Sequence, residues 1–180
     1  KALENQLKEV NTSLQTQLNE NEKLRAKLQE QAIRDPLTGA FNRRYFSEAL
    51  DQESARSVRE NSPFSILILD VDHFKQFNDQ YGHPLGDRVL QHVGQLLRDM
   101  LPARAIAARY GGEEFAVVLP EARLSDAVAV AERMRKKIEQ TPILVQGKEC
   151  AVTVSIGVSD LKNDQPMTPA QLIERADQTL

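Results

Sequence analysis

The sequence has little cysteine, no long apolar run and no excess of basic charge. Its one cysteine, Cys150, excludes an internal disulfide framework and is typical of a chain in a reducing cytoplasm. No segment approaches the ~18 to 20 apolar residues of a membrane-spanning helix, and no signal peptide opens the chain. A net charge of -3 argues against a dedicated nucleic-acid binder, which would carry a basic stripe. We therefore expect a cytoplasmic chain that contacts neither membrane nor nucleic acid.

What is present fits a soluble domain with an appendage. The 180 residues are enough for one ordinary domain and a further extended segment. A hydrophobic content of 41% supports a core, and a charged content of 27% is normal for a soluble protein. Because the chain begins in a helical pattern without an initiator Met, we expect it to be part of a longer protein.

Residues 1–34 contain neither glycine nor proline and follow a heptad pattern. Polar Asn at such a seam costs stability but favours a fixed register and two strands. A lone helix with an apolar stripe would not be stable in water, so we predict a long parallel dimeric coiled coil, with a single solvated helix as the alternative. The seam residues are Leu3, Leu7, Val10, Leu14, Gln17, Asn21, Leu24, Leu28 and Gln31.

The segment Arg34-Asp35-Pro36-Leu37-Thr38-Gly39 interrupts this pattern. Proline disfavours helix in the residue before it, and Thr-Gly is typical of a turn. We place the boundary here, with a dimerisation and signalling helix over residues 1–34 and a globular domain over residues 35–180.

The globular part alternates strands and helices. Residues 64–69 are nearly all apolar, as in a strand buried on both faces. Apolar runs on either side of Gly111-Gly112 predict a β-hairpin, and residues 152–158 alternate as in a half-buried strand. With helices between them, the order is strand, helix, hairpin, helix, strand. This order predicts an α+β, ferredoxin-like domain whose central, mostly antiparallel sheet is flanked by helices, with the two intervening helices on one face.

A helix is predicted directly after residues 34–39, with Tyr45, Phe46, Ala49 and Leu50 on one face, and three more helices follow the first strand. Residues 85–100 carry apolar side chains at helical spacing. A second helix follows Ser125 as N-cap, and a last helix begins with a capping box at Thr168 and Gln171. The second helix is expected to bury Val128, Ala131, Met134 and Ile138.

Acidic residues gather at two predicted strand ends. Asp70 and Asp72 follow the buried strand, and Glu113 and Glu114 follow the glycine pair. Carboxylates at the exit of a buried strand are costly unless solvated, paired or bound to metal. If the hairpin pairs beside this strand, Asp70 and Glu113 can share one cation or two, and Mg²⁺ prefers such oxygen ligands. The alternative is a solvated polar turn with a helix-capping aspartate.

Asn78 and Asp87 together can read a guanine edge. An aspartate accepts from guanine N1–H and the exocyclic amine, whereas adenine has no donor at N1. His83 could bind a phosphate or ribose, or pack in the turn between them. Asp87 could instead be a first-turn helix acid.

These motifs, in this order, resemble the GGDEF diguanylate cyclase family, with Glu as the middle acid of the signature. The resemblance covers residue 33 to the chain end. It rests on Asp35-Pro36-Leu37-Thr38-Gly39 with Asn42-Arg43-Arg44, Asp70-Val71-Asp72-His73-Phe74-Lys75, Asn78-Asp79, Gly82-His83, Gly86-Asp87, and Arg109-Tyr110-Gly111-Gly112-Glu113-Glu114-Phe115. It implies a palm-like fold and the condensation of two GTP into cyclic di-GMP and two pyrophosphates.

The resemblance also implies a role for each site residue. Asp70, the Val71 carbonyl and Glu113 would bind Mg²⁺ or Mn²⁺, two ions per active site, and Glu113 or Glu114 would help deprotonate the ribose 3′-hydroxyl. By the same resemblance, the Lys75 ammonium is a third catalytic group, which would steady developing charge. The substrate-binding residues would be Asn78 and Asp87 on guanine with His83 nearby, the backbone of His73, Phe74 and Lys75 on the phosphates, and Gly111 and Gly112 at the turn.

Each domain of this family holds one GTP, so the reaction needs two domains face to face. We therefore expect a homodimer through the coiled coil, with a higher oligomer as the alternative, and an upstream sensory or receiver domain. Two departures stand out. The family's Arg-x-x-Asp inhibition motif is replaced by Pro102-Ala103-Arg104-Ala105, and the last helix stops at Leu180 without the basic residues that usually follow. The alternatives are a degenerate GTP-binding sensor and a coiled-coil interaction scaffold.

Overall fold

The computed structural model describes residues 2–161 and 167–180, with the side chains of residues 2–4 and 9 outside the described set. The chain divides into two compact units, residues 1–33 and 34–180, which are considered separately here. Within the described ranges, none of the helices is both long enough and apolar enough to cross a membrane.

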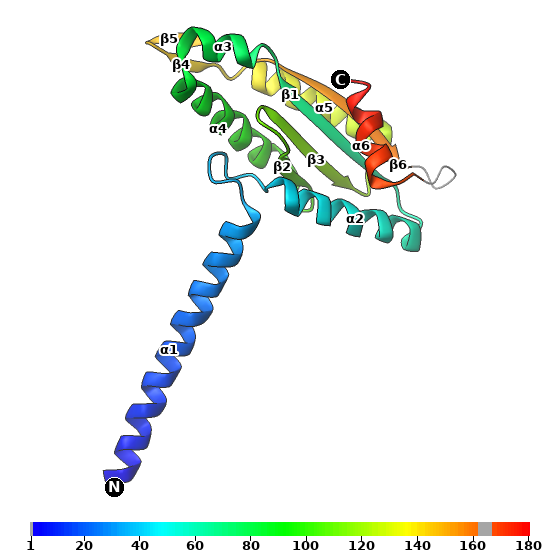
Figure 1. Cartoon of the computed structure of the whole chain (residues 1–180). Coiled ribbons are helices and arrows are strands. Elements are labelled where there is room, and N and C mark those ends of the chain that lie inside the picture. The colour runs from blue at the N-terminus through cyan, green and yellow to red at the C-terminus, as the bar shows by residue number, and fades with distance from the viewer. Residues whose placement is uncertain (1, 162–166) are drawn as a thin grey trace. The chain divides into compact units, whose positions relative to one another are not determined.

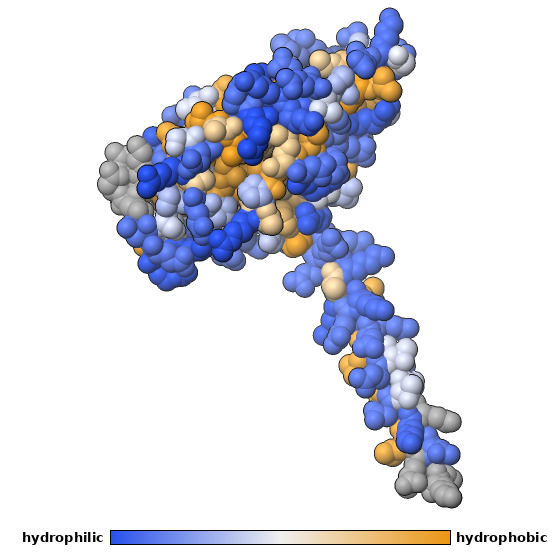
Figure 2. Space-filling view, turned by 180° about the vertical axis from the view of Figure 1, so that it is seen from behind, coloured by the Kyte–Doolittle hydropathy of each residue, from blue (hydrophilic) through white to orange (hydrophobic). Residues whose placement is uncertain are grey.

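The first unit is a single helix, α1, over Ala2–Ile33. The helical conformation expected for this segment is confirmed. In Figure 2 its surface is mostly hydrophilic with separate apolar spots. Pairing of two such helices stays a prediction, and the predicted seam position Leu3 lies among the undescribed side chains. The described apolar seam residues, each 51–69% exposed in the single chain, are Leu7, Val10, Leu14, Leu24 and Leu28.

A four-stranded antiparallel sheet forms the centre of the second unit (Figure 1). Its order is β2-β3-β1-β6. β1 is central because its residues are apolar on both faces, and six of its eight positions in a row are buried. The strands are β1 (Phe64–Val71), β2 (Ile106–Arg109), β3 (Glu114–Pro120) and β6 (Val154–Leu161).

Helices cover both faces of this sheet, and Figure 1 shows their arrangement. One core lies under α4 (His83–Met100) and α5 (Leu124–Glu139), the two helices of the predicted ferredoxin-like order, which do share a face. A second core lies under α2 (Arg43–Glu60) and α6 (Pro169–Asp177) on the other face. The α+β architecture with an antiparallel sheet flanked by helices is therefore confirmed.

The N-terminus of α5 differs from the prediction. Its N-cap is Arg123, not Ser125, because the carboxylate of Asp126 accepts the Arg123 backbone N–H at 3.2 Å. Val128 is 50% exposed rather than buried, and Ala127 occupies the inward position. By contrast, the Thr168–Gln171 capping box of α6 forms as predicted.

Three short elements were not predicted. α3 (Phe74–Tyr81) follows β1 directly and buries none of its residues fully. β4 (Ile143–Val145) and β5 (Lys148–Cys150) form a separate two-stranded ribbon. Of the three, α3 bears most on function, because it begins just after Asp70 and carries Asn78.

Candidate active site

The acidic residues of the two predicted strand ends lie together. β1 pairs with β3 so that Asp70 is opposite Glu114, and the Val71 N–H donates to the Glu113 carbonyl at 3.4 Å. The pKa of Asp70 is raised, first by burial and then by the negative charges of Glu113, Glu114 and Asp72. The hairpin does pair beside the Asp70 strand, and it brings the carboxylates of Asp70, Glu113 and Glu114 close together.

The hairpin turn is closed around Glu114. We call residues 110–114 the Gly-Gly turn. Its backbone bonds run from the Tyr110 and Gly111 N–H groups to the Glu114 carbonyl, at 2.8 and 3.2 Å. A Cβ atom at Gly111 would overlap Oε2 of Glu114, whereas one at Gly112 would meet nothing within 4 Å. Glycine is needed at 111 because the carboxylate lies against it; neither glycine is among the described residues with positive φ.

Asp72 has a partner within the protein. Its Oδ1 accepts from the Ser155 hydroxyl at 2.7 Å, and its N–H donates to the Thr153 carbonyl at 3.0 Å. Both bonds tie the end of β1 to the neighbouring segment around β6. We assign Asp72 this structural role, which differs from the solvated, helix-capping aspartate that was the alternative from the sequence.

The chain turns sharply between Asp72 and α3. His73 adopts the left-handed conformation, with φ 57° and ψ 23°, and its side chain makes no capping bond. Left-handed backbone in a residue other than glycine is uncommon and often marks a functional site. The first N–H groups of a helix have no acceptor within it, and here they belong to the start of α3, immediately after the acidic cluster. Lys75, in the same turn, is exposed.

Asn78 packs against α4 at a glycine. A Cβ atom at Gly86 would overlap Oδ1 of Asn78 and lie 3.2 Å from Cζ of Phe74. Oδ1 of Asn78 is buried and has no hydrogen-bond partner among the described residues. Buried polar atoms of this kind require an explanation, and one is a ligand. Asp87 follows Gly86 and is exposed, so the structure brings Asn78 and Asp87 to the same junction of α3 and α4.

A pocket of about 300 Å³ lies on another side of α3. It includes Val71, His73 and Phe74 of the predicted site, together with the segment 150–153. Asn78, Asp87 and the Gly-Gly turn are not among its lining residues. His83 is exposed at the start of α4 and also lies outside this pocket. The predicted residues therefore line an open surface around α3 rather than one closed cavity.

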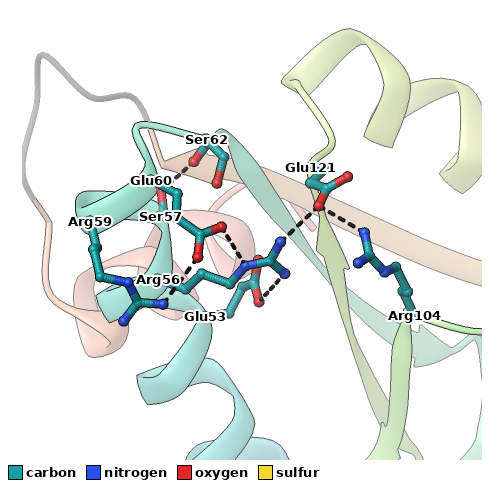
Figure 3. A network of polar contacts seen from close by, with 8 residues as sticks. All are labelled: Glu53, Arg56, Ser57, Arg59, Glu60, Ser62, Arg104 and Glu121. Carbon is teal, nitrogen blue, oxygen red and sulfur yellow. Dashed lines mark hydrogen bonds and ion pairs between the residues drawn. The ribbon is translucent and has the colours of Figure 1, made fainter.

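Arg104, in the segment that replaces the family's inhibition motif, belongs to an ion-pair network. Its Nη1 lies 2.8 Å from Oε1 of Glu121, which also accepts from Nη2 of Arg56 at 2.8 Å (Figure 3). Arg56 in turn pairs with Glu60 at 2.8 Å. Arg104 is 71% exposed, but its guanidinium already has an anionic partner.

Two residues of the site escaped the sequence reasoning. Gly86 was noted only as part of a motif, and its contact with Asn78 depends on the packing of α3 on α4. Arg109 was likewise only quoted, yet its Nε and Nη2 donate to the Gly112 carbonyl at 3.1 and 2.8 Å. Both lie within two positions of predicted site residues in the sequence, which was the one available signal.

Comparison with known proteins shows the family to which the chain belongs. The family model described as "Diguanylate cyclase, GGDEF domain" matches residues 32–180. Response regulator PleD of Caulobacter vibrioides is 42% identical over 151 residues, which cover 83% of this chain and 33% of that protein. Diguanylate cyclase DgcP of Pseudomonas aeruginosa is 39% identical over 84% of this chain and 22% of that protein. The chain thus spans a third or less of these two relatives.

Solved structures give the same result. The coiled coil and GGDEF domain of Caulobacter crescentus DgcB, in complex with c-di-GMP, has a TM-score of 0.82 and 30% identity, covering 94% of this chain and 91% of that one. Diguanylate cyclase SiaD of Pseudomonas aeruginosa, in complex with its activator SiaC, has a TM-score of 0.80 and 37% identity, covering 97% and 66%. The chain belongs to the diguanylate cyclase GGDEF-domain family.

Proposed function

We propose that this chain condenses two GTP molecules into cyclic di-GMP and releases two pyrophosphates. One observation carries the proposal: Asp70 lies against Glu113 and Glu114 across β1 and β3, next to the N-terminus of α3. Membership of the family and relatives named as diguanylate cyclases support the reaction class. The assignment of each residue below is part of the proposal.

A divalent cation fits the acidic end of β1. Asp70, the Val71 carbonyl and Glu113 are the groups that would hold Mg²⁺ or Mn²⁺, two ions per site. Within the described part of the chain, no three His, Cys, Asp or Glu side chains are grouped to hold a metal. That agrees with Mg²⁺, which usually takes one or two carboxylates and completes its shell with water and substrate phosphates. When bound, such ions would favour ionisation of the attacking hydroxyl and balance the charge of the leaving pyrophosphate.

The phosphates of GTP would lie at the N-terminus of α3. The N-terminus of a helix favours anions through its free N–H groups and its dipole. At α3 the phosphates would therefore be bound by the backbone of His73, Phe74 and Lys75. The exposed ammonium of Lys75 would add positive charge as the α-phosphate is attacked. Glu113 or Glu114 would accept the proton of the 3′-hydroxyl; both lie at the turn, and the choice between them remains open.

The base of GTP would lie between α3 and α4. The partnerless Oδ1 of Asn78 is buried against Gly86. From that position, the Asn78 amide N–H would donate to guanine O6 or a ring nitrogen. The exposed carboxylate of Asp87 can accept from guanine N1–H and the exocyclic amine. Adenine lacks the N1 donor, so this pair supports GTP over ATP. His83 would contact the ribose or phosphate edge of the same nucleotide.

Two copies of the domain are required, because each holds one GTP. The exposed seam of α1 offers a means to bring them together, since pairing would remove the apolar side chains from water. The similarity to a solved structure whose name includes a coiled coil supports a coiled coil in this segment, which we propose to be a parallel homodimer. Linkage through paired helices raises the effective concentration of one domain for the other. An upstream sensory or receiver domain would act through the same helix.

The proposal is tested by incubating the chain, at high protein concentration, with GTP and Mg²⁺ and quantifying cyclic di-GMP and pyrophosphate. We expect both products in a 1:2 ratio, and none from Glu113→Ala, which removes the carboxylate and keeps the backbone carbonyl that accepts from Val71. Binding of a fluorescent GTP analogue without product would support the GTP-sensor alternative. Neither binding nor product would support the scaffold alternative, and either result would overturn the enzyme proposal.

A further inference from the structure

Arg109 connects the Gly-Gly turn to a distant part of the chain. Its guanidinium donates Nε and Nη2 to the Gly112 carbonyl, while Nη1 lies 3.4 and 3.5 Å from the two carboxylate oxygens of Asp35. The side chains of this pair are only 21% and 16% exposed. One planar group thus holds the turn on one side and Asp35 on the other. The planar fork is specific to arginine, since a lysine ammonium is a single point charge.

Asp35 is itself fixed, so it can serve as an anchor. Its Oδ1 accepts from the N–H and the hydroxyl of Thr38, at 2.9 and 2.7 Å, and its N–H donates to the Ala40 carbonyl at 2.8 Å. Thr38 is buried, and its carbonyl accepts from Arg98 of α4. This turn, residues 35–40, was singled out in the sequence, and the nucleotide chemistry above leaves it without a role.

The turn 35–40 packs on α4 through a second close contact. A Cβ atom at Gly94 would lie 2.9 Å from Cβ of Thr38 and 3.2 Å from its carbonyl oxygen. Beyond the turn, Phe41 exchanges backbone bonds with β2, as its N–H donates to Ala107 and its carbonyl accepts from Arg109. The anchor is therefore attached both to α4 and to the outer edge of β2.

The other side of the Gly-Gly turn has its own support. The ring of Tyr110 packs edge-on against Phe46, with ring centroids 5.6 Å apart, and the guanidinium of Arg43 lies 4.5 Å from the Tyr110 centroid. These contacts hold the start of the turn against α2. No comparable support among the described residues reaches Gly112 except the side chain of Arg109. Glu113, the next residue, is thus positioned through that one carbonyl and through the Val71 bond.

We propose that Arg109 is a positioning residue, which with Asp35 sets where the Glu113 carboxylate stands relative to Asp70. This inference rests on the proposed function for its catalytic consequence, although the contact itself does not. Loss of the Arg109 fork would leave GTP recognition at Asn78 and Asp87 in place and misplace the turn. The defect would therefore appear in kcat rather than in KM.

The test compares Arg109→Ala, Arg109→Lys and Asp35→Asn, alone and as the Asp35→Asn/Arg109→Ala double variant. Asn at 35 keeps an oxygen for Thr38 and removes the charge that faces Arg109. We expect kcat to fall about tenfold or more in Arg109→Ala and by less in the other single variants, with KM for GTP changed less than about twofold. Because Asp35 acts through Arg109, the double variant should match Arg109→Ala. Arg59→Ala, an exposed arginine at the far end of α2, is the matched control.

Amide hydrogen exchange provides a readout that does not need turnover. In Arg109→Ala, exchange in residues 110–114 should accelerate about tenfold, while α4 stays protected as in the wild type. Unchanged exchange in the turn, a wild-type kcat in Arg109→Ala, or additive losses in the double variant would each overturn the inference. If the wild-type chain makes no product, the proposed function fails, whereas the exchange measurement still decides whether Arg109 holds the turn.

Discussion

Gly86→Ala should separate nucleotide recognition from folding. The added methyl group would overlap Oδ1 of Asn78, the end of a flexible side chain, so Asn78 must rotate out of its buried position. Oδ1 has no hydrogen-bond partner to lose. The substitution therefore disturbs a side chain that contributes little to the fold and, by our proposal, much to guanine binding.

Gly86→Ala is expected to have a small effect on the free energy of unfolding and a larger effect on KM for GTP. Replacing a helical glycine by alanine gains about 0.5–1 kcal/mol, and local overpacking against Asn78 and Phe74 costs about 1–3 kcal/mol. The free energy of unfolding should change by at most about 2 kcal/mol, a shift of ~4–8 °C in Tm for a domain of this size. Loss of one or two hydrogen bonds to guanine, about 1–1.5 kcal/mol each, should raise KM for GTP about 5- to 150-fold.

The assay measures Tm, KM for GTP and the affinity for ATP in three proteins: wild type, Gly86→Ala and Gly94→Ala. Gly94 serves as the contrast because a methyl group there meets the Thr38 backbone, which cannot rotate away. We expect Gly94→Ala to lower Tm without selective loss of GTP over ATP, and Gly86→Ala to lose that selectivity. Unchanged GTP affinity in Gly86→Ala would refute the assignment of Asn78 to the base.

Three further predictions concern charge and assembly. Because the pKa of Asp70 is raised in the folded state, this residue lowers stability as pH rises from its unfolded pKa through the raised value. Without metal, Asp70→Asn should therefore raise Tm more at pH 7 than at pH 4, and it should abolish product formation. A Tm at pH 7 equal to or lower than that of the wild type would contradict this. Since Arg104 pairs with Glu121 and the Arg-x-x-Asp pattern is absent, we expect little product inhibition through this segment, and a tight cyclic di-GMP titration that Arg104→Ala abolishes would show otherwise. Asn21→Leu should change the oligomeric state or the basal rate, as measured by light scattering and pyrophosphate release, and an unchanged dimer with an unchanged rate would exclude a switching role for this seam position.

The parts of the fold that sequence could predict are those with a sustained pattern. The nearly continuous apolar run over residues 64–69 made β1 recognisable, and all six of these positions are buried. The helical spacing of Val89, Val93 and Leu97 did the same for α4. α3 and the β4–β5 ribbon have no such signal, because α3 buries no residue fully and each ribbon strand has three residues. At α5 the sequence offered Ser125 as a cap, but Asp126 reaching back to Arg123 decided the start.

The candidate site, like the fold, could be predicted from the sequence only in part. Strand alternation and turn chemistry were enough to bring Asp70 and Glu113 together, because both lie at the ends of predictable strands. The reason for Gly111 was not accessible: the Gly-Gly pair predicted a hairpin turn, but only the structure shows that Gly111 accommodates the Glu114 carboxylate. The bond between Arg109 and Asp35 spans 74 positions of the sequence, and only the docking of residues 35–41 on β2 brings them together.

The acidic cluster of Asp70, Glu113 and Glu114 destabilises the folded state, and this cost is an argument for a bound cation. Asp70 is partly buried beside Glu113 and Glu114, and no described cation compensates it, since Arg109 is turned to Gly112 and Asp35. A stable fold without a ligand would replace one of these acids or pair it, because like charges in a partly buried site raise the free energy of the folded state. The same arrangement becomes favourable once a divalent cation and triphosphate bring their own charges. The repulsion among these carboxylates in the absence of a ligand is therefore the physical reason for their proposed affinity for metal-bound GTP.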